Sequence, residues 1–214
     1  MTKFEIFSDP ICPWCFIGKT WFDRAREAYP EQEFEVIWSP FQLNPGMPLS
    51  GMPRSNYLDK KFGGRQRAID AYKPIVTTAI KHNIDINFKS IKNTPNTLDA
   101  HRLIHWSRLE GIQSKIVSAL FKAYFQEGKD IGSKDVLIKI STDAGIDNEL
   151  IRRLLSSDQD KELIKSHDHS ARKTGIKAVP MFIVDDTYAV SGAQKPELWK
   201  NVFSEIEHFR KKNV

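Results

Sequence analysis

The two cysteines of the chain carry its most recognisable chemistry. Cys12 and Cys15 are separated by Pro13 and Trp14, and the 214 residues contain no other cysteine. Thiol–disulfide exchange needs one thiolate that attacks a disulfide sulfur and a second thiol close enough to release the mixed disulfide. Two intervening residues give that spacing, so the pair predicts a redox-active dithiol.

Such a pair could also be half of a zinc site or two small residues of the core. Structural zinc usually needs four ligands, and the sequence has no second cysteine pair. His101 and His105 lie four positions apart, but no further ligand is evident beside them. His167 and His169 point to different sides of an expected helix and are interpreted as surface residues. We therefore expect no metal site.

The dithiol lies where a strand gives way to a helix. Cys12 is expected at the N-cap and Pro13 at the first helical position, where a missing amide hydrogen costs nothing. The positive end of the helix dipole favours a thiolate at the N-terminus. This placement predicts that Cys12 is the exposed nucleophile and that Cys15, one turn further on, is the shielded resolving thiol.

The residues between the cysteines are candidate substrate contacts. Pro13 and Trp14 tune the reduction potential of such a pair, and Trp14 adds no charge that would stabilise a thiolate. Its indole offers an apolar surface to a peptide or thiol substrate. The alternative is that Trp14 simply packs beside the motif.

The elements around the dithiol follow a strand–helix–strand order. The pattern predicts a strand at Phe4–Phe7, a helix over Pro13–Tyr29 and a strand at Glu33–Trp38. Near the end of the chain, a hairpin of Met181–Val184 and Tyr188–Val190 precedes an amphipathic helix. These two parts predict an α/β protein of thioredoxin fold.

The residues between these parts show helical patterns and little strand alternation. They predict an all-helical insertion at 46–175, with the thioredoxin-fold domain made of 1–45 and 176–214. Expected helices and helix signals are Arg65–Asn83, Asn96–Glu110, an apolar stripe from Ile116 to Phe125 that ends at Gly128, and N-caps at Ser133 and Asp147.

Val179 and Pro180 form a second landmark, directly before the strand Met181–Val184. Proline at a strand start cannot donate to the sheet. In a thioredoxin fold, a cis-proline at this place faces the dithiol and leaves the preceding backbone free to pair with an extended substrate. We therefore expect a cis Val179–Pro180 bond and a substrate-binding role for both residues.

The overall composition indicates a protein of the cytoplasm. Its formal charge of +5 comes from 32 basic and 27 acidic residues, without a long tract of one sign. Aromatic residues are not interleaved with the basic ones, so a nucleic-acid partner is not expected. No apolar run is long enough to span a bilayer, and Met1-Thr2-Lys3 does not begin a signal-peptide pattern.

The chain resembles the DsbA-like thioredoxin-domain proteins and, within them, the cytoplasmic FrnE-type disulfide oxidoreductases. The resemblance implies a helical domain inserted in a thioredoxin fold, a redox-active Cys12/Cys15 pair and a cis Pro180. Ala178 departs from the common Gly-Val-Pro form. The blocks that carry the resemblance are 9–19 (DPICPWCFIGK), 40–45 (PFQLNP), 96–103 (NTLDAHRL), 120–125 (LFKAYF), 178–182 (AVPMF) and 191–194 (SGAQ).

Related 2-hydroxychromene-2-carboxylate isomerases and kappa-class glutathione transferases share this architecture but typically have serine where Cys12 stands. The cysteine pair therefore favours a protein disulfide oxidoreductase that reduces, forms or isomerises disulfides.

No bound cofactor is expected; glutathione is a candidate co-substrate, and disulfide-bearing proteins, small thiols or a thioredoxin system are candidate partners. A glutathione-dependent isomerase or transferase and a redox-independent chaperone-like module remain alternatives, and a homodimer through the insertion is open.

Three polar residues near these blocks have open roles. Asp9 is suited either to proton transfer at Cys15 or to stabilising the turn before the helix. Asn96 is a candidate helix cap after Pro95, and by resemblance Gln194 contributes to the loop near the dithiol.

Overall fold

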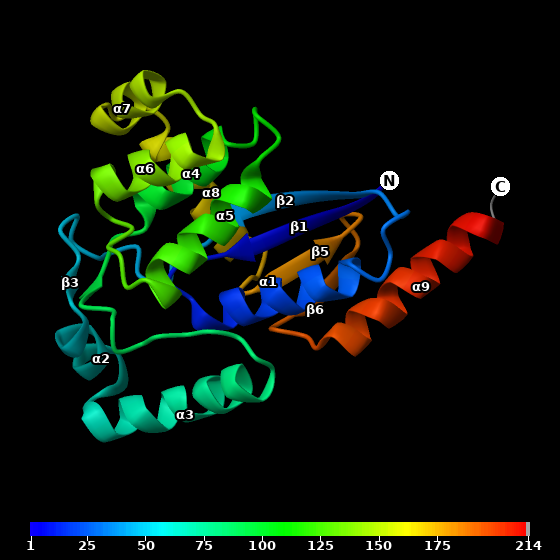
Figure 1. The fold of residues 1–214 in the computed structure, drawn as a ribbon, viewed down its shortest axis with the longest axis horizontal. Coiled ribbons are helices and arrows are strands. Elements are labelled where there is room, and N and C mark those ends of the chain that lie inside the picture. The colour runs from blue at the N-terminus through cyan, green and yellow to red at the C-terminus, as the bar shows by residue number, and fades with distance from the viewer. Residues whose placement is uncertain (213–214) are drawn as a thin grey trace.

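The computed structural model describes residues 1–212, with side chains described up to residue 208, and its centre is a four-stranded sheet (Figure 1). The strand order is β2-β1-β5-β6. These strands are β1 (Thr2–Ser8), β2 (Phe34–Pro40), β5 (Met181–Val184) and β6 (Tyr188–Ser191). β1 is parallel to β2 and antiparallel to β5, and β5 is antiparallel to β6. The sheet thus joins segments from the two ends of the chain, as the thioredoxin fold requires.

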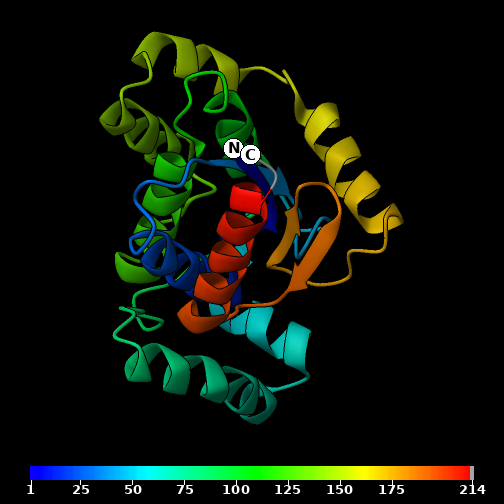
Figure 2. The same ribbon diagram turned by 90° about the vertical axis from the view of Figure 1, so that its right-hand side faces the viewer.

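Alternate residues of β1 face different layers. Phe4 and Ile6 are fully buried on the side covered by α1 (Pro13–Arg26) and α9 (Pro196–Lys212), which pack against each other. Figure 2 shows α9 in front of the sheet. An aromatic cluster fills this layer. Its rings meet mostly edge to face, the arrangement that aromatic pairs prefer. Its members are Phe4, Phe22, Phe182, Trp199 and Phe203.

The insertion supplies the other elements, all between β2 and β5 in sequence. α4, α5 and α8 contact β2, whereas α2 and α3 form a separate arm that reaches the core through α1 (Figure 1). The bounds are β3 (Met52–Pro53), α2 (Arg54–Phe62), α3 (Arg65–Lys81), β4 (Asn93–Thr94), α4 (Leu98–Trp106), α5 (Gln113–Phe121), the π-helix η1 (Lys122–Gln126), α6 (Lys134–Ala144), α7 (Asn148–Ser156) and α8 (Lys161–Lys173).

Several expected boundaries shift. The first helix ends at Arg26 rather than at Tyr29, and the second strand runs on to Pro40. The cap at Asp147 is confirmed, because its carboxylate accepts a hydrogen bond from the Leu150 amide at 2.8 Å. Ser133 occupies the N-cap of α6, but its side chain makes no capping bond. The sequence patterns therefore predict where the elements lie more accurately than they predict the residues at which the elements end.

Two features had no signal in the sequence patterns. The expected helix through Phe125 is α5 followed by the π-helix η1, a wider turn that helical periodicity does not distinguish from an α-helix. The expectation of an all-helical insertion is wrong in one detail, because it contains the short ribbon of β3 and β4, which lies within stretches rich in proline and glycine or polar residues. Within residues 1–212, no helix is long and apolar enough to cross a membrane.

Arg102 on α4 is a fully buried cation that joins α4 to the α7–α8 connection. Its guanidinium donates to the carbonyl oxygens of Leu154, Ser157 and Gln159 at 2.8–2.9 Å, and to Asp99 at 2.7 Å. These carbonyls come from the end of α7 and the loop that follows, where intrahelical donors are absent. One side chain thereby binds three backbone carbonyls, of which that of Leu154 also accepts from the Ser157 amide and hydroxyl.

We predict that Arg102→Leu lowers the free energy of unfolding by about 3 kcal/mol or more, because it removes the four hydrogen bonds of a fully buried side chain, including the one to the Asp99 carboxylate. Arg152→Leu is the matched control, since Arg152 is exposed and donates only to the neighbouring Asn148 side chain. Urea unfolding of both variants measures the difference. An equal, small effect of the two substitutions would contradict this role of Arg102.

Candidate active site

The dithiol lies at the N-terminus of α1, as the sequence predicts. Cys12 is the N-cap residue in an extended conformation, and Pro13 is the first helical residue. The Cys12 amide donates to the Asp9 carbonyl at 2.9 Å, and the Cys12 carbonyl accepts from the amides of Cys15 and Phe16 at 3.1 and 3.2 Å. This hydrogen-bonded turn fixes the start of the helix, so the dipole acts on the Cys12 side chain.

The expectation that Cys12 is an exposed sulfur is wrong. Cys12 is 5% exposed and Cys15 is 1% exposed, and both are free thiols. The Cys12 sulfur is covered from the opposite loop, where the Val179 carbonyl oxygen lies 3.7 Å from Sγ. Cys15 is still the more shielded of the two.

Burial separates the two thiols chemically. Desolvation raises the pKa of Cys15 well above its ordinary value, and the hydrogen bond and charge of the adjacent Cys12 raise it further. The Ser8 hydroxyl and the Asp9 backbone act in the opposite direction. Cys15 is therefore held as a thiol beside Cys12.

The Val179–Pro180 peptide bond is cis, as expected, and its loop faces the dithiol. The Pro180 carbonyl accepts from the Gly192 amide at 2.8 Å, which ties this loop to the end of β6. On the facing side, Gly18 of α1 lies so close that an added Cβ would meet Pro180 Cγ at 3.0 Å. The absence of a side chain at Gly18 lets α1 and the proline loop pack together.

Beside the dithiol, Trp14 lines a pocket of about 460 Å³ that also includes Trp21, Thr78, Gln194 and Lys195. Trp14 is half-buried and Pro13 is buried. The Gln194 amide nitrogen donates to the Ser191 carbonyl at 2.7 Å, so Gln194 shapes the loop between β6 and α9. Trp14 packs against the core, in agreement with its packing interpretation, and it also borders this pocket.

Asp9 is a fully buried carboxyl directly before the dithiol turn. Its oxygens accept from the amides of Ile11 at 3.2 Å and Leu43 at 2.6 Å, and the Thr97 hydroxyl lies 3.5 Å away. These contacts support the turn-stabilising interpretation of Asp9. Desolvation is stronger than these hydrogen bonds, so the pKa of Asp9 rises to about 7.

His101, expected as a solvated or helix-packing residue, is a buried neighbour of Asp9. Its Nε2 lies 3.9 Å from Asp9 Oδ1, too far for a hydrogen bond, and has no other hydrogen-bond partner among the described residues. Desolvation lowers the pKa of His101 to about 4. At neutral pH the imidazole is uncharged, so the contact with Asp9 is not a strong ion pair. No local pattern in the sequence indicated that these two residues are neighbours.

The remaining polar candidates lie apart from the dithiol or support the fold. The N-cap of α4 is Thr97 rather than Asn96, the expected cap; Asn96 Oδ1 accepts from the Leu98 amide at 2.9 Å from one residue before the cap. The His105 and His167 rings are 6.3 Å apart, and His167 and His169 are exposed as expected. Among the described residues, no three histidine, cysteine or acidic side chains are arranged to hold a metal ion.

A family model of the DSBA-like thioredoxin domain matches residues 3–204, nearly the whole chain. The chain belongs to the DsbA-like thioredoxin-domain family. This DsbA-like chain is 28% identical to the uncharacterized protein YwbO of Bacillus subtilis over 205 residues, which cover 94% of this chain and 95% of that protein.

Solved structures support the same assignment. A probable DsbA oxidoreductase from Streptomyces coelicolor has a TM-score of 0.84 to this DsbA-like chain at 26% identity, with coverage of 96% of this chain and 89% of that one. The cytosolic disulfide reductase DsbM of Pseudomonas aeruginosa, solved with GSH, has a TM-score of 0.70 at 14% identity, covering 96% and 99%. At that identity the likeness to DsbM shows the fold alone.

We predict opposite pH dependences of stability when either member of the Asp9–His101 pair is replaced. Between about pH 4 and 7, folded Asp9 holds a proton that the unfolded chain has lost. The contribution of Asp9 to folding stability therefore falls as pH rises through this range. Between about pH 4 and 6.5, folded His101 lacks a proton that the unfolded chain holds. The contribution of His101 to folding stability therefore increases as pH rises through this range. In the intact protein these two effects largely offset each other.

In His101→Asn only the Asp9 effect remains, so its stability relative to wild type should fall by about 1 kcal/mol per pH unit over this window. In Asp9→Asn the relative stability should rise with a similar slope up to pH 6.5. Urea unfolding at pH 4.5, 5.5 and 6.5 measures both slopes. Parallel profiles for the two variants and wild type would contradict the assignment of an uncharged pair.

Proposed function

We propose that this DsbA-like protein is a thiol–disulfide oxidoreductase of FrnE type that works through Cys12 and Cys15. The observation that carries the proposal is the pair of free thiols at the start of α1, opposite the Val179 carbonyl and the cis Pro180 loop. Membership of the family supports oxidoreductase chemistry in general. The cysteine in the position typical of serine in related isomerases supports dithiol chemistry in particular.

The unequal environments of the two cysteines assign their order of action. Cys12 occupies the N-cap of α1 and is less deeply buried than Cys15, so we assign it the attacking role. The Cys12 thiolate attacks one sulfur of a substrate disulfide, and the other substrate sulfur leaves as a thiolate that takes up a proton. Cys15, whose raised pKa keeps it protonated until this step, then loses its proton and attacks the Cys12 sulfur. The second substrate thiol leaves, and the protein keeps the Cys12–Cys15 disulfide while two electrons pass to the substrate.

Substrate binding falls to the surfaces that border the dithiol. Val179, Pro180 and Trp14 are the proposed contacts, with Pro13 fixing the turn that presents Cys12. The Val179 carbonyl already lies next to the Cys12 sulfur, where a substrate backbone amide would find an acceptor. The adjacent pocket of about 460 Å³ has room for the side chains or the small thiol that flank a disulfide.

We infer that a low-molecular-weight thiol such as glutathione, or a thioredoxin system, returns the Cys12–Cys15 disulfide to the dithiol. The GSH found with DsbM in a protein of the same fold supports glutathione as this reductant. We also propose a cytoplasmic location, supported by the cytosolic assignment of that reductase. No bound cofactor is needed, because the two thiols carry both electrons.

We predict that Cys12→Ser abolishes glutathione-coupled reduction of a protein disulfide such as insulin, because the attacking sulfur is lost. Cys15→Ser incubated with the substrate in the absence of glutathione should instead trap a covalent mixed disulfide between Cys12 and the substrate, since no resolving thiol remains. Mass spectrometry of the quenched reaction detects that adduct.

Both substitutions are nearly isosteric, so each variant serves as the folding control of the other. Equal activity of Cys12→Ser and wild type would refute the proposed function. Glutathione-dependent isomerase activity or holdase activity that survives both substitutions would favour one of the alternative classes.

A further inference from the structure

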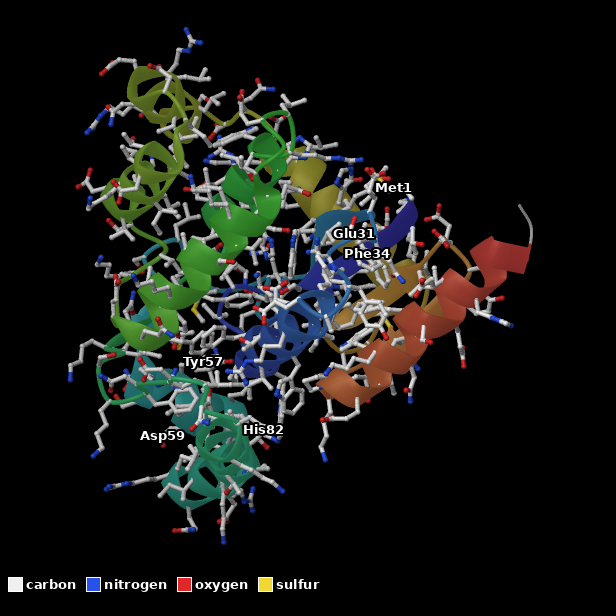
Figure 3. All side chains as sticks on the ribbon, turned by 45° about the vertical axis from the view of Figure 1, so that its right-hand side comes forward. Met1, Glu31, Phe34, Tyr57, Asp59 and His82 are labelled. Atoms are coloured by element: carbon white, nitrogen blue, oxygen red, sulfur yellow. The ribbon has the colours of Figure 1, made fainter. Side chains whose placement is uncertain are left out.

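A long groove between α2 and α3 lies apart from the dithiol and the pocket beside Trp14. Its volume is about 750 Å³, within the range of ligand-binding clefts. In Figure 3, Asp59 marks α2 next to α3. The groove is lined by residues of α2 and α3, together with Phe88 and Lys89.

Two aromatic rings and one cation organise the wall of the groove. The rings of Tyr72 and Phe88 meet edge to face with centroids 5.0 Å apart. The Arg54 guanidinium lies 5.2 Å from the Tyr72 centroid and 5.4 Å from that of Phe88. These contacts hold the cation in place without neutralising it, so its donors are available to an anion.

The charges of the groove are unbalanced and unpaired. Four cations line it, Arg54, Arg65, Lys73 and Lys89, against one carboxylate, Asp59. Within the described part of the chain, none of the four cationic groups has a hydrogen bond or an ion pair from its side chain. The groove therefore presents an uncompensated positive field to an incoming partner.

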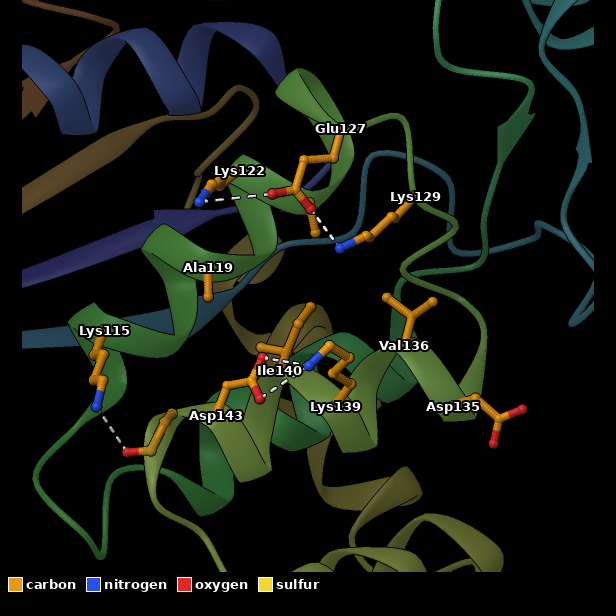
Figure 4. Close-up of a pocket in the computed structure, with 12 residues that line it drawn as sticks. Lys115, Ala119, Lys122, Glu127, Lys129, Asp135, Val136, Lys139, Ile140 and Asp143 are labelled. Atoms are coloured by element: carbon orange, nitrogen blue, oxygen red, sulfur yellow. Dashed lines mark hydrogen bonds and ion pairs between the residues drawn. The ribbon is translucent and has the colours of Figure 1, made fainter.

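The pocket between α5, η1 and α6 shows the opposite pattern (Figure 4). It also has four lysines, but each is already satisfied. Lys115 donates to the Ala144 carbonyl, Lys122 and Lys129 pair with Glu127, and Lys139 pairs with Asp143. Each lysine of this pocket thus has a hydrogen-bond or ion-pair partner, and three of them pair with carboxylates, which sets the α2–α3 groove apart.

The shape of the groove fits a segment of chain. Its α3 wall extends from Arg65 to Thr77, a rise of about 18 Å at 1.5 Å per residue. An extended segment of about five residues spans that length. Apolar side chains are exposed along it, with Ile69 50% and Val76 39% exposed.

The same helix joins the groove to the active site. Ile75 and Ala79, on another face of α3, pack in one cluster with Ile17 and Trp21 of α1. Thr78, next to the groove residue Thr77, lines the pocket beside Trp14. The groove and the pocket beside Trp14 are therefore lined by neighbouring residues of α3.

We propose that the α2–α3 groove docks an acidic, apolar segment of the disulfide-bearing protein substrate. The inference rests on the proposed function for the identity of the partner, but not for the binding itself. Carboxylates of the segment meet the unpaired cations, and its apolar side chains cover Ile69, Val76 and the ring of Tyr72. The groove thereby selects among protein substrates by the charge of a region away from the disulfide.

A cysteine-free peptide tests the binding separately from redox chemistry. The probe is a peptide of about six alternating leucine and glutamate residues with an uncharged dye, followed by fluorescence anisotropy on the reduced full-length protein. We expect saturable binding that weakens at least about tenfold in Lys73→Glu/Lys89→Glu, because two attractions become repulsions. Ile69→Ser/Val76→Ser should also weaken binding, and added salt should weaken it further.

Lys134→Glu/Lys177→Glu is the matched control, because both lysines are exposed, lie outside the groove and give the same change in net charge. This control should bind the probe like wild type. All the substituted side chains are exposed, so circular dichroism and thermal unfolding should show folded variants.

Equal binding by the groove and control variants would overturn the proposal, as would equal binding of a probe with lysine in place of glutamate. A dimer of the wild-type protein that the groove substitutions dissociate would also overturn it, because a second copy would then occupy the groove. Saturable binding of a small aromatic carboxylate, with no binding of the peptide, would do the same. Loss of peptide binding leaves the Cys12→Ser assay unaffected, so failure of this proposal is distinguishable from failure of the proposed function.

Discussion

The buried carboxyl of Asp9 holds together the three segments on which the dithiol turn rests. The backbone carbonyl of Asp9 accepts a hydrogen bond from the Cys12 amide. Its carboxyl accepts from the amides of Ile11 and Leu43, and the Thr97 hydroxyl at the start of α4 lies within reach. Removing a polar group from water costs free energy unless hydrogen bonds within the protein replace those to water. The carboxyl therefore requires the end of β1, the loop after β2 and the insertion to stay in one arrangement beneath the cysteines.

The pairing of the first and fifth strands sets the other side of the site. The antiparallel register places Phe7 opposite Met181, so the residues after β1 lie beside those before β5. Those residues are the dithiol turn and the cis Val179–Pro180 loop. The contact between Cys12 and Val179, 167 residues apart in sequence, is thus a direct result of strand register. The close approach of Gly18 to Pro180 completes this constraint.

Local patterns were sufficient to predict much of this structure. The cysteine spacing, Pro13 at a helix start and the hairpin from Met181 to Val190 each depend on neighbouring residues, and each is present. The buried state of Cys12 was not predicted, because the Val179 carbonyl was expected to be free for a substrate, whereas it lies against the Cys12 sulfur. His101 was interpreted as a packing or surface residue, since its proximity to Asp9 exists only after α4 docks.

The groove between α2 and α3 belongs to the same group of features that only the folded chain shows. Its cations are spread over 54–89 and resemble an ordinary solvated charge pattern in the sequence. Only the fold gathers them around exposed apolar side chains and leaves them unpaired, in contrast to the compensated lysines near α6. Burial and pairing, rather than residue type, distinguish the two surfaces.

The central claim is that Cys12 and Cys15 form one two-electron redox centre. Equilibration of the protein in glutathione buffers of graded potential, followed by acid quenching, thiol alkylation and mass spectrometry, tests it most directly. The account predicts a single transition from a doubly alkylated form to an unalkylated form that is lighter than the dithiol by two hydrogen atoms and contains a Cys12–Cys15 disulfide. Independent glutathionylation of the two cysteines, with no internal disulfide at any potential, would contradict it.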